Sequence, residues 1–338
     1  MRIACLAAVA ALAFLSAADT SAQEQPAHII RAGMIGLDTS HVPAFVGILN
    51  KPNASGDVAG IKIVAGYPGG TDLPASHDRV AKFTEAIRAK GVEIVDSIPQ
   101  LLEKVDVVML ESVDGRIHLE EATQVIKAGK PLWIDKPVAG SLVDAIVIFE
   151  LAKKHHVPVF SSSALRFGAD VQGMKNNAEL GAIVGVETWG PCSYSTGTPD
   201  LFFYGIHGVE PLFALMGPGC EKVSRVATKD VDYATGVWKD GRVGTYRGIH
   251  KGHASLGAMV FGTNAILPVN KVGNYNDLCP EIAKFFKTGQ PPVSAEETLE
   301  IFAFMEAADE SKRQNGAPVA LADVLAKAKI EAAAKLKE

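Results

Sequence analysis

The stretch Gly33–His41 constrains the fold more than any other part of the 338-residue sequence. An apolar run, Ile29–Ile35, is typical of a buried strand, and a turn at Gly36 follows it directly. The next segment, His41–Leu49, carries apolar residues at helical spacing. A strand that turns at a glycine into a helix is the corner where many α/β proteins hold nucleotide phosphates, because the helix N-terminus favours anions.

This corner departs from the dinucleotide fingerprint G-x-G-x-x-G of Rossmann domains. With Gly36 as the first glycine, the other two positions hold Asp38 and His41. A carboxylate at Asp38 would repel a pyrophosphate, and it could itself cap the helix. We therefore expect Asp38→Gly to tighten NAD(P) binding if Asp38 blocks the site. The candidate cofactor-binding residues at the corner are Gly36, Leu37, Asp38, Thr39, Ser40 and His41.

Residues 29–160 alternate short apolar runs with helical patterns, which predicts a doubly wound α/β domain around a parallel sheet. The predicted strands are Ile29–Ile35, Ile61–Gly66, Val92–Val95, Val105–Leu110, Pro131–Ile134 and Val157–Phe160. The predicted helices are His41–Leu49, Ser76–Lys90, Ile98–Lys104, Arg116–Ala128 and Leu142–His155.

The pattern changes after Phe160. Strand-like runs separated by glycine turns predict a second α+β domain with an open, mostly antiparallel sheet. We place the two domains at residues 23–160 and 161–338. The predicted strands of the second domain are Val184–Trp189, Val223–Val226, Val243–Arg247 and Ala258–Phe261, and its predicted helices are Tyr204–Met216, Ala295–Gln314 and Leu321–Leu336.

Residues 1–22 read as a cleavable signal peptide, so we expect a periplasmic or secreted protein. Arg2 precedes an apolar stretch that runs from residue 3 to 18, and small residues follow it. The alternative, a membrane anchor, needs roughly 20 apolar residues to span a bilayer. The net charge of −5 gives no general attraction to nucleic acid or to anionic lipid.

Three cysteines, Cys192, Cys220 and Cys279, remain after signal cleavage. They are too far apart to give a metal-binding spacing, and we predict no metal site from them. Two alternatives stay open, which are one disulfide in an oxidising compartment or three partly buried thiols.

The tripeptide Asp135-Lys136-Pro137 follows the fifth predicted strand. The carboxyl ends of parallel strands face the ligand crevice in doubly wound folds, so Lys136 should point into that crevice. A lysine there can donate to a substrate oxygen, or act as acid or base if its pKa is depressed. The alternative is an ordinary solvated loop lysine.

The order of these features resembles the Gfo/Idh/MocA family of glucose-fructose oxidoreductase and inositol dehydrogenase. The Asp-Lys-Pro motif stands about 100 residues after the glycine corner, and an open-sheet domain follows it. The resemblance covers nearly all of the mature chain. It implies NAD or NADP as cofactor, hydride transfer at a hydroxyl of a sugar or related polyol, and a catalytic Lys136. It also implies a homo-oligomer formed through the second sheet.

Other positions match the family's pattern. The resemblance implies that Glu111 and His118 are cofactor-binding, with His118 near nicotinamide and substrate. In the same segment, Glu111 and Asp114 replace residues that are usually neutral. The resemblance also implies a substrate-binding role for Arg166 at the domain junction, and an acid/base role for His207.

Two departures concern the partners of these residues. The acid of the family's Asp-x-x-x-His motif is Phe203 here, so we expect Tyr204 or Glu210 to replace it beside His207, because both share its helix face. The second predicted strand ends without the acid that usually holds a ribose. Tyr67, at that end, is a candidate for stacking on an adenine.

Two hypotheses follow from the sequence. The first is an exported oxidoreductase acting on a sugar-like small molecule with NAD(P). The second is a non-redox carbohydrate-binding or accessory protein that has lost or weakened its nucleotide site. A metal-dependent hydrolase using His118, Glu111 and Asp114 is a distant third, because no ligand spacing is diagnostic.

Overall fold

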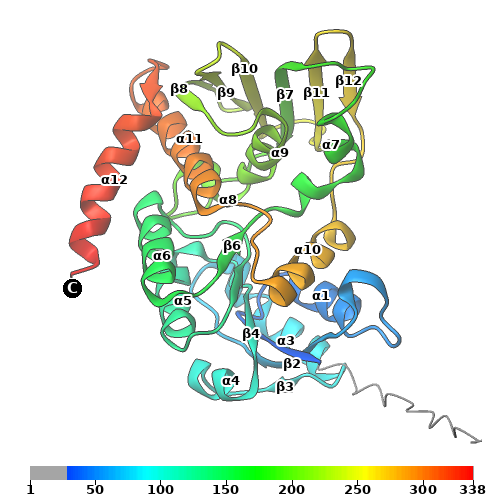
Figure 1. Ribbon diagram of the computed structural model, residues 1–338. Helices are drawn as coiled ribbons and strands as arrows, with labels where there is room; N and C mark the ends of the chain where they lie inside the picture. The colour runs from blue at the N-terminus through cyan, green and yellow to red at the C-terminus, as the bar shows by residue number, and fades with distance from the viewer. Residues whose placement is uncertain (1–28, 338) are drawn as a thin grey trace, which may run out of the picture.

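The computed structural model describes residues 29–337 (Figure 1). The predicted signal peptide lies outside the described residues. Within the described range, helices that combine the length and apolar character needed to cross a bilayer are absent.

The N-terminal half forms a parallel sheet with strand order β3-β2-β1-β4-β5-β6. The chain first adds strands on one side of β1 and then, beginning with β4, on the other side. Doubly wound folds bind ligands at this change of strand order. Strand β4 is buried on both faces, because helices cover each side. The strands are β1 (Ile30–Ile35), β2 (Ile61–Tyr67), β3 (Glu93–Ile94), β4 (Val107–Leu110), β5 (Leu132–Ile134) and β6 (Val159–Ser161).

The predicted helix Ser76–Lys90 is wrong in one respect, because the structure has two helices there. Pro74 starts the first one, since proline suits the first turn, and the chain leaves helical geometry at Arg79. The helices and short 3₁₀ segments of this half are α1 (His41–Leu49), η1 (Gly56–Val58), α2 (Pro74–His77), α3 (Val80–Arg88), α4 (Ile98–Lys104), η2 (Gly115–Ile117), α5 (His118–Lys127) and α6 (Leu142–His155).

The second sheet has strand order β12-β11-β7-β10-β9-β8-β13. The sheet is mixed. Strands β7 and β10 pair parallel to each other, and the other neighbouring strands of this sheet pair antiparallel. Helices α9 and α11 pack on one of its faces (Figure 1). The strands are β7 (Ile183–Pro191), β8 (Cys220–Ala227), β9 (Val231–Trp238), β10 (Val243–Ile249), β11 (Gly257–Gly262), β12 (Ile266–Val269) and β13 (Val319–Ala320).

Helix α10 returns from the second half to pack on the first (Figure 1). Its first residue, Tyr275, stacks near His41 with ring centroids 4.7 Å apart, and Phe285 meets Phe160 of β6 at 4.7 Å. This contact closes one side of the crevice above the parallel sheet. The helical segments of this half are η3 (Ala164–Phe167), α7 (Ala169–Met174), α8 (Asp200–Phe203), α9 (Ile206–Met216), α10 (Tyr275–Thr288), α11 (Ala295–Arg313) and α12 (Leu321–Lys335).

The three cysteines are buried, free thiols. The structure therefore agrees with the alternative of three unpaired thiols and not with that of a disulfide.

Candidate functional site

A cavity of about 580 Å³ lies between the two sheets, at the carboxyl ends of the parallel strands. It receives residues from the glycine corner, from the loop after β5, from α9 and from the start of α10. Its lining residues are Thr39, Ser40, His41, Ala75, Arg79, Val113, Asp135, Lys136, Ala164, Leu165, Ser193, Phe203, Tyr204, His207, Leu256, Gly273, Asn274 and Tyr275.

Lys136 lines this cavity, as its place after β5 predicts. Its backbone amide donates to Asp135 Oδ1 at 2.8 Å, which fixes the turn. Its amine lies 5.9 Å from the centre of the Tyr204 ring. Burial lowers the pKa of Lys136, against the opposing effect of the Asp135 carboxylate. A lysine in this state can exchange a proton more easily than a solvated one.

His207 lies in the same cavity, near the start of α9. Its Nδ1 is 2.8 Å from the Ser163 hydroxyl, and the Tyr204 ring packs edge-on at 4.9 Å. Burial lowers the pKa of His207 well below its usual range, and the nearby Lys136 adds to this. The imidazole is therefore neutral near pH 7, which suits it to accept a proton.

Glu210 does not partner His207, which corrects one expectation. Its carboxylate pairs with Arg166 at 2.6 Å, and Arg166 also binds Glu297. Both side chains of the first pair are buried. The partner of His207 is Ser163, whose hydroxyl the sequence did not single out, although it stands in a run of three serines after β6.

Arg166 also departs from its expected place. It borders a second cavity that includes Gln172 and Lys175, and it is absent from the lining of the cavity that holds Lys136. With both ends of its guanidinium engaged by carboxylates, Arg166 joins η3 to α9 and α11. A structural role for Arg166 is the simpler interpretation of this geometry.

The glycine corner is closed tightly by its own chain. Gly36 has a φ of +80°, and a Cβ there would lie 2.4 Å from the Ser112 nitrogen, so only glycine fits. The amides of Gly36 and Leu37 donate to the carbonyls of Tyr67 and Pro68, at 3.0 and 2.8 Å. These two amides are thus engaged within the protein.

Asp38 does not cap α1, which corrects a second expectation. Its carboxylate accepts the Val113 amide at 2.9 Å and the Ser76 hydroxyl at 2.5 Å. Helix α1 begins after Ser40, which makes no side-chain cap bond. Asp38 is fully buried, and burial raises the pKa of its carboxyl. It therefore holds helix α2 and the loop after β4 together over the corner, because one partner comes from each.

Tyr67 and His118 are both absent from the cavity lining. Tyr67 packs against the hydrophobic core at the end of β2. His118 is fully buried, with Nε2 2.7 Å from the Ser112 carbonyl oxygen and Nδ1 3.3 Å from that of Val138. It ties the loop after β4 to the loop after β5, which is a structural role.

Three residues at the ends of adjacent elements meet beside the cavity. His41 Nδ1 lies 2.6 Å from Asp135 Oδ2, and Glu111 lies next to both. Glu111 is fully buried, and burial together with Asp135 and Asp38 raises its pKa well above the usual range. The sequence motif assigns Asp135 no role of its own, although its position directly before Lys136 is a signal that places it at the site.

A nicotinamide nucleotide, which the fold family implies, fits the cavity side of this corner. Thr39 and Ser40 expose the N-terminal end of α1 to the cavity, and Arg79 borders the same space. A helix N-terminus and an arginine are both suited to a phosphate group. These residues, with Lys136, would hold the cofactor.

A segment of the sequence matches a known family. Residues 73–163 match the Gfo/Idh/MocA family, described as an oxidoreductase family with an NAD-binding Rossmann fold. The matched segment includes Glu111, His118 and the Asp135-Lys136-Pro137 motif. A search of curated proteins finds no match to the sequence.

Solved structures show the same fold over most of the chain. Scyllo-inositol dehydrogenase from Lactobacillus casei, solved with NAD(H) and scyllo-inositol, has a TM-score of 0.70 at 15% identity and covers 87% of this chain and 99% of its own. Myo-inositol 2-dehydrogenase from Lactobacillus plantarum has a TM-score of 0.69 at 16% identity, covering 86% and 99%. GenD2 from gentamicin A biosynthesis, solved with NAD, has a TM-score of 0.69 at 15% identity, covering 87% and 96%.

Proposed function

Because the resemblance to the Gfo/Idh/MocA oxidoreductase family is confirmed in sequence and in fold, we propose that this chain is an oxidoreductase of that type. It would act on a hydroxyl of a sugar or sugar-derived molecule, with NAD or NADP as cofactor. The observation that carries the proposal is the meeting of Lys136 and His207 in one cavity, each with a lowered pKa.

The two residues divide the proton chemistry between them. With Nδ1 of His207 engaged by Ser163, Nε2 is the nitrogen left to accept a proton from the substrate hydroxyl. Lys136 can donate to the same oxygen and stabilise charge on it. Tyr204 packs against both side chains and limits their movement. A bound nicotinamide would supply the acceptor for the hydride that leaves the carbon.

The test uses the mature chain, from residue 23 onward. Calorimetry with NAD, NADH, NADP and NADPH should show binding of one of the two pairs. Reduction of that cofactor, followed by absorbance across a panel of sugars and polyols, should identify the substrate class. Absence of binding for all four nucleotides would contradict the proposal.

One observation favours a second candidate, the non-redox carbohydrate-binding or accessory protein. Asp38, Glu111 and Asp135 place three buried carboxylates around the corner where a dinucleotide would bring its phosphates. Like charges this close disfavour phosphate binding. Sugar binding by a protein that binds none of the four nucleotides would support this candidate.

We also propose export by the predicted signal peptide and a homo-oligomer formed through the second sheet. The exposed apolar side chains of that sheet support the second point, since they come from β7, β8, β10 and β12; they are Val184, Val226, Val243 and Ile266. Fractionation of the native host would test the first point, and light scattering of the purified protein the second.

A further inference from the structure

Three potential metal ligands converge at the ends of adjacent elements of the parallel sheet. His41 is the first residue of α1, Glu111 follows β4 and Asp135 follows β5. The nitrogen and oxygen atoms that they offer all lie within 4.8 Å of one another. We call these three residues the Glu111 cluster.

Among these three residues, Glu111 is the one whose burial needs an explanation. Its side chain is fully buried, and within residues 29–337 neither carboxyl oxygen has a hydrogen-bond partner. A buried carboxyl group without partners costs free energy whether it is charged or neutral, because a neutral one still needs an acceptor for its proton. A ligand that binds both oxygens, or one of them, would remove this cost.

The lysine charge near the cluster comes from the Lys136 amine, which acts on both carboxyl groups without forming an ion pair with either. In the described part of the chain, Lys136 makes no ion pair within 4.0 Å, and its amine is directed towards the Tyr204 ring. His41 is already shared with Asp135 at 2.6 Å. Two carboxylates and one imidazole therefore face one another beside a cavity, and a divalent cation would balance them.

We propose that His41, Glu111 and Asp135 bind one divalent cation, Zn²⁺ or Mn²⁺, at the edge of the cavity. One imidazole nitrogen and two carboxylate oxygens are a common donor set for these ions. Zinc ligands lie about 2.0–2.2 Å from the ion, so opposite donors stand up to roughly 4 Å apart. The present spacing of 4.8 Å or less thus needs only a short inward movement.

The site is open towards the cavity, because His41 and Asp135 line it and Glu111 lies behind them. Three protein ligands leave at least one coordination position free, as in catalytic metal sites. That position faces the space that also holds Lys136 and His207. A bound cation would therefore contact an oxygen of whatever occupies the cavity.

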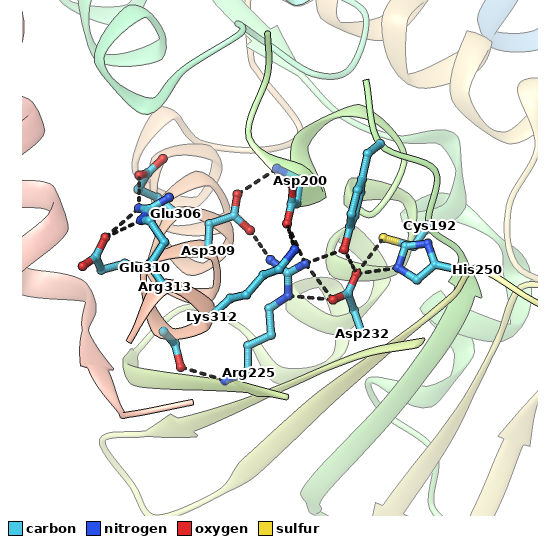
Figure 2. Close-up of polar contacts among 12 residues, drawn as sticks. Cys192, Asp200, Arg225, Asp232, His250, Glu306, Asp309, Glu310, Lys312 and Arg313 are labelled. Carbon is cyan, nitrogen blue, oxygen red and sulfur yellow. Dashed lines mark hydrogen bonds and ion pairs between the residues drawn. The ribbon is translucent and has the colours of Figure 1, made fainter. Parts of the chain in front are cut away.

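A second group in the molecule, Cys192, Asp232 and His250, has comparable spacing but carries no such proposal. Figure 2 shows why, since both oxygens of Asp232 already have partners. Oδ1 accepts from Arg225 at 2.7 Å, and Oδ2 binds Tyr194 and His250 Nε2, the latter at 2.7 Å. Its charge is already balanced within the protein.

The test is metal binding by the mature chain after removal of metal with a chelator. We expect calorimetry to show one Zn²⁺ or Mn²⁺ per chain, and we expect Glu111→Gln to weaken binding by at least about tenfold, since a ligand matters no less than its outer partners. Asp78→Asn is the matched control, because Asp78 forms an exposed pair with His77 at 3.1 Å and should leave affinity unchanged.

His41→Gln gives an independent check, because His41 is on a helix start and is partly exposed, so this variant should fold if Glu111→Gln does not. Loss of binding in His41→Gln with normal circular dichroism supports the site. Binding that is absent in the unmodified chain, or equal in the chain and in both variants, overturns the proposal. Binding lost only in Cys192→Ser also overturns it, because the ion would then lie in the second group.

Discussion

Two buried clusters in this protein both contain carboxyl groups, but they differ in how the charge of those groups is balanced. In the second sheet, Arg225 binds Asp232, Asp200 and Asp309, and Lys312 also reaches Asp200 (Figure 2). We call this group the Arg225 cluster. In the parallel sheet, the Glu111 cluster gathers two carboxyl groups and a histidine, and no arginine or lysine of residues 29–337 forms an ion pair with them.

The difference separates structural from functional use of buried charge. Arg225 is fully buried, and each end of its guanidinium meets an acceptor, so the cluster joins β8 and β9 to α8 and α11. Among the residues that the structure describes, Glu111 has no hydrogen-bond partner, and it lies at the carboxyl ends of parallel strands, where this fold binds ligands. Removing Arg225 should therefore lower the free energy of unfolding, whereas removing the carboxyl group of Glu111 should raise it.

The largest effect on stability is expected for Arg225→Met. Breaking a buried ion pair leaves carboxylates such as Asp232 uncompensated, which typically costs about 3–5 kcal/mol. Urea denaturation should show this loss in the free energy of unfolding. Arg88→Met is the control, because its pair with Glu85 on α3 is exposed on both sides and contributes far less to stability. Equal losses in the two variants would contradict a structural role for the Arg225 cluster.

Lys136→Met should lower turnover by about 10²–10⁴-fold, the range expected for a general acid or base. It should leave the free energy of unfolding nearly unchanged or slightly higher, because burial already lowers the pKa of Lys136. Steady-state kinetics on the substrate found by the sugar panel would measure the loss. Lys82→Met is the control, because Lys82 is exposed on α3. Full activity in Lys136→Met would remove this residue from the mechanism.

Glu111→Met should raise the free energy of unfolding of metal-free protein by about 1–3 kcal/mol, because it removes a buried group without partners. This is the opposite sign to Arg225→Met, and it sharpens the comparison of the two clusters. Urea denaturation in the presence of a chelator provides the measurement. A decrease of similar size in the free energy of unfolding would show that Glu111 has a compensating partner in solution.

The pH dependence of stability tests another carboxyl group near the corner. Glu121 is buried and accepts a hydrogen bond from Ser112 at 2.7 Å, and burial raises its pKa to about 8. The folded state therefore holds a proton that the unfolded chain releases above about pH 4.3. This contribution to stability is complete below that pH and falls by about 1.4 kcal/mol per unit up to about pH 8. Glu121→Gln should flatten that slope, and an unchanged slope would contradict the shift.

The smallest effect is expected for Asp38→Asn. An amide cannot accept both the Val113 amide and the Ser76 hydroxyl as well as a carboxylate does, so stability should fall by about 1 kcal/mol. Removal of the charge should tighten NAD(P) binding by less than about tenfold, since Asp38 is fully buried and does not line the cavity. Calorimetry would measure the affinities of the variant for NAD and for NADP. Weaker binding in the variant would show that Asp38 helps to shape the site.

The sequence predicted most of the parallel sheet, because its strands are apolar on both faces and its helices have clear periodicity. The bounds of α1, α4 and α6 agree with the prediction. Strand β9 was not predicted, because Asp232 and Gly236 interrupt its apolar pattern. Asp232 is buried there because it binds Arg225 of the neighbouring strand β8, together with Tyr194 and His250, and local pattern does not reveal these contacts.

The site was predicted only in part. The position of Lys136 follows from its strand, and that of His207 from the family resemblance. Helical spacing placed Glu210 on the same face as His207, but its actual partner, Arg166, comes from η3. In the same way, the partners of Asp38 come from helix α2 and from the loop after β4, which are both distant from it in sequence. Contacts between elements, rather than patterns within them, decide these pairs.

We infer that a divalent cation balances the carboxyl groups of the Glu111 cluster, as Arg225 balances those of its own cluster. Anomalous diffraction from crystals of the mature protein grown with Mn²⁺ would locate that ion. We expect one peak in contact with His41, Glu111 and Asp135, and none among Cys192, Asp232 and His250. A cluster without a peak, or a peak only at the second group, would contradict it.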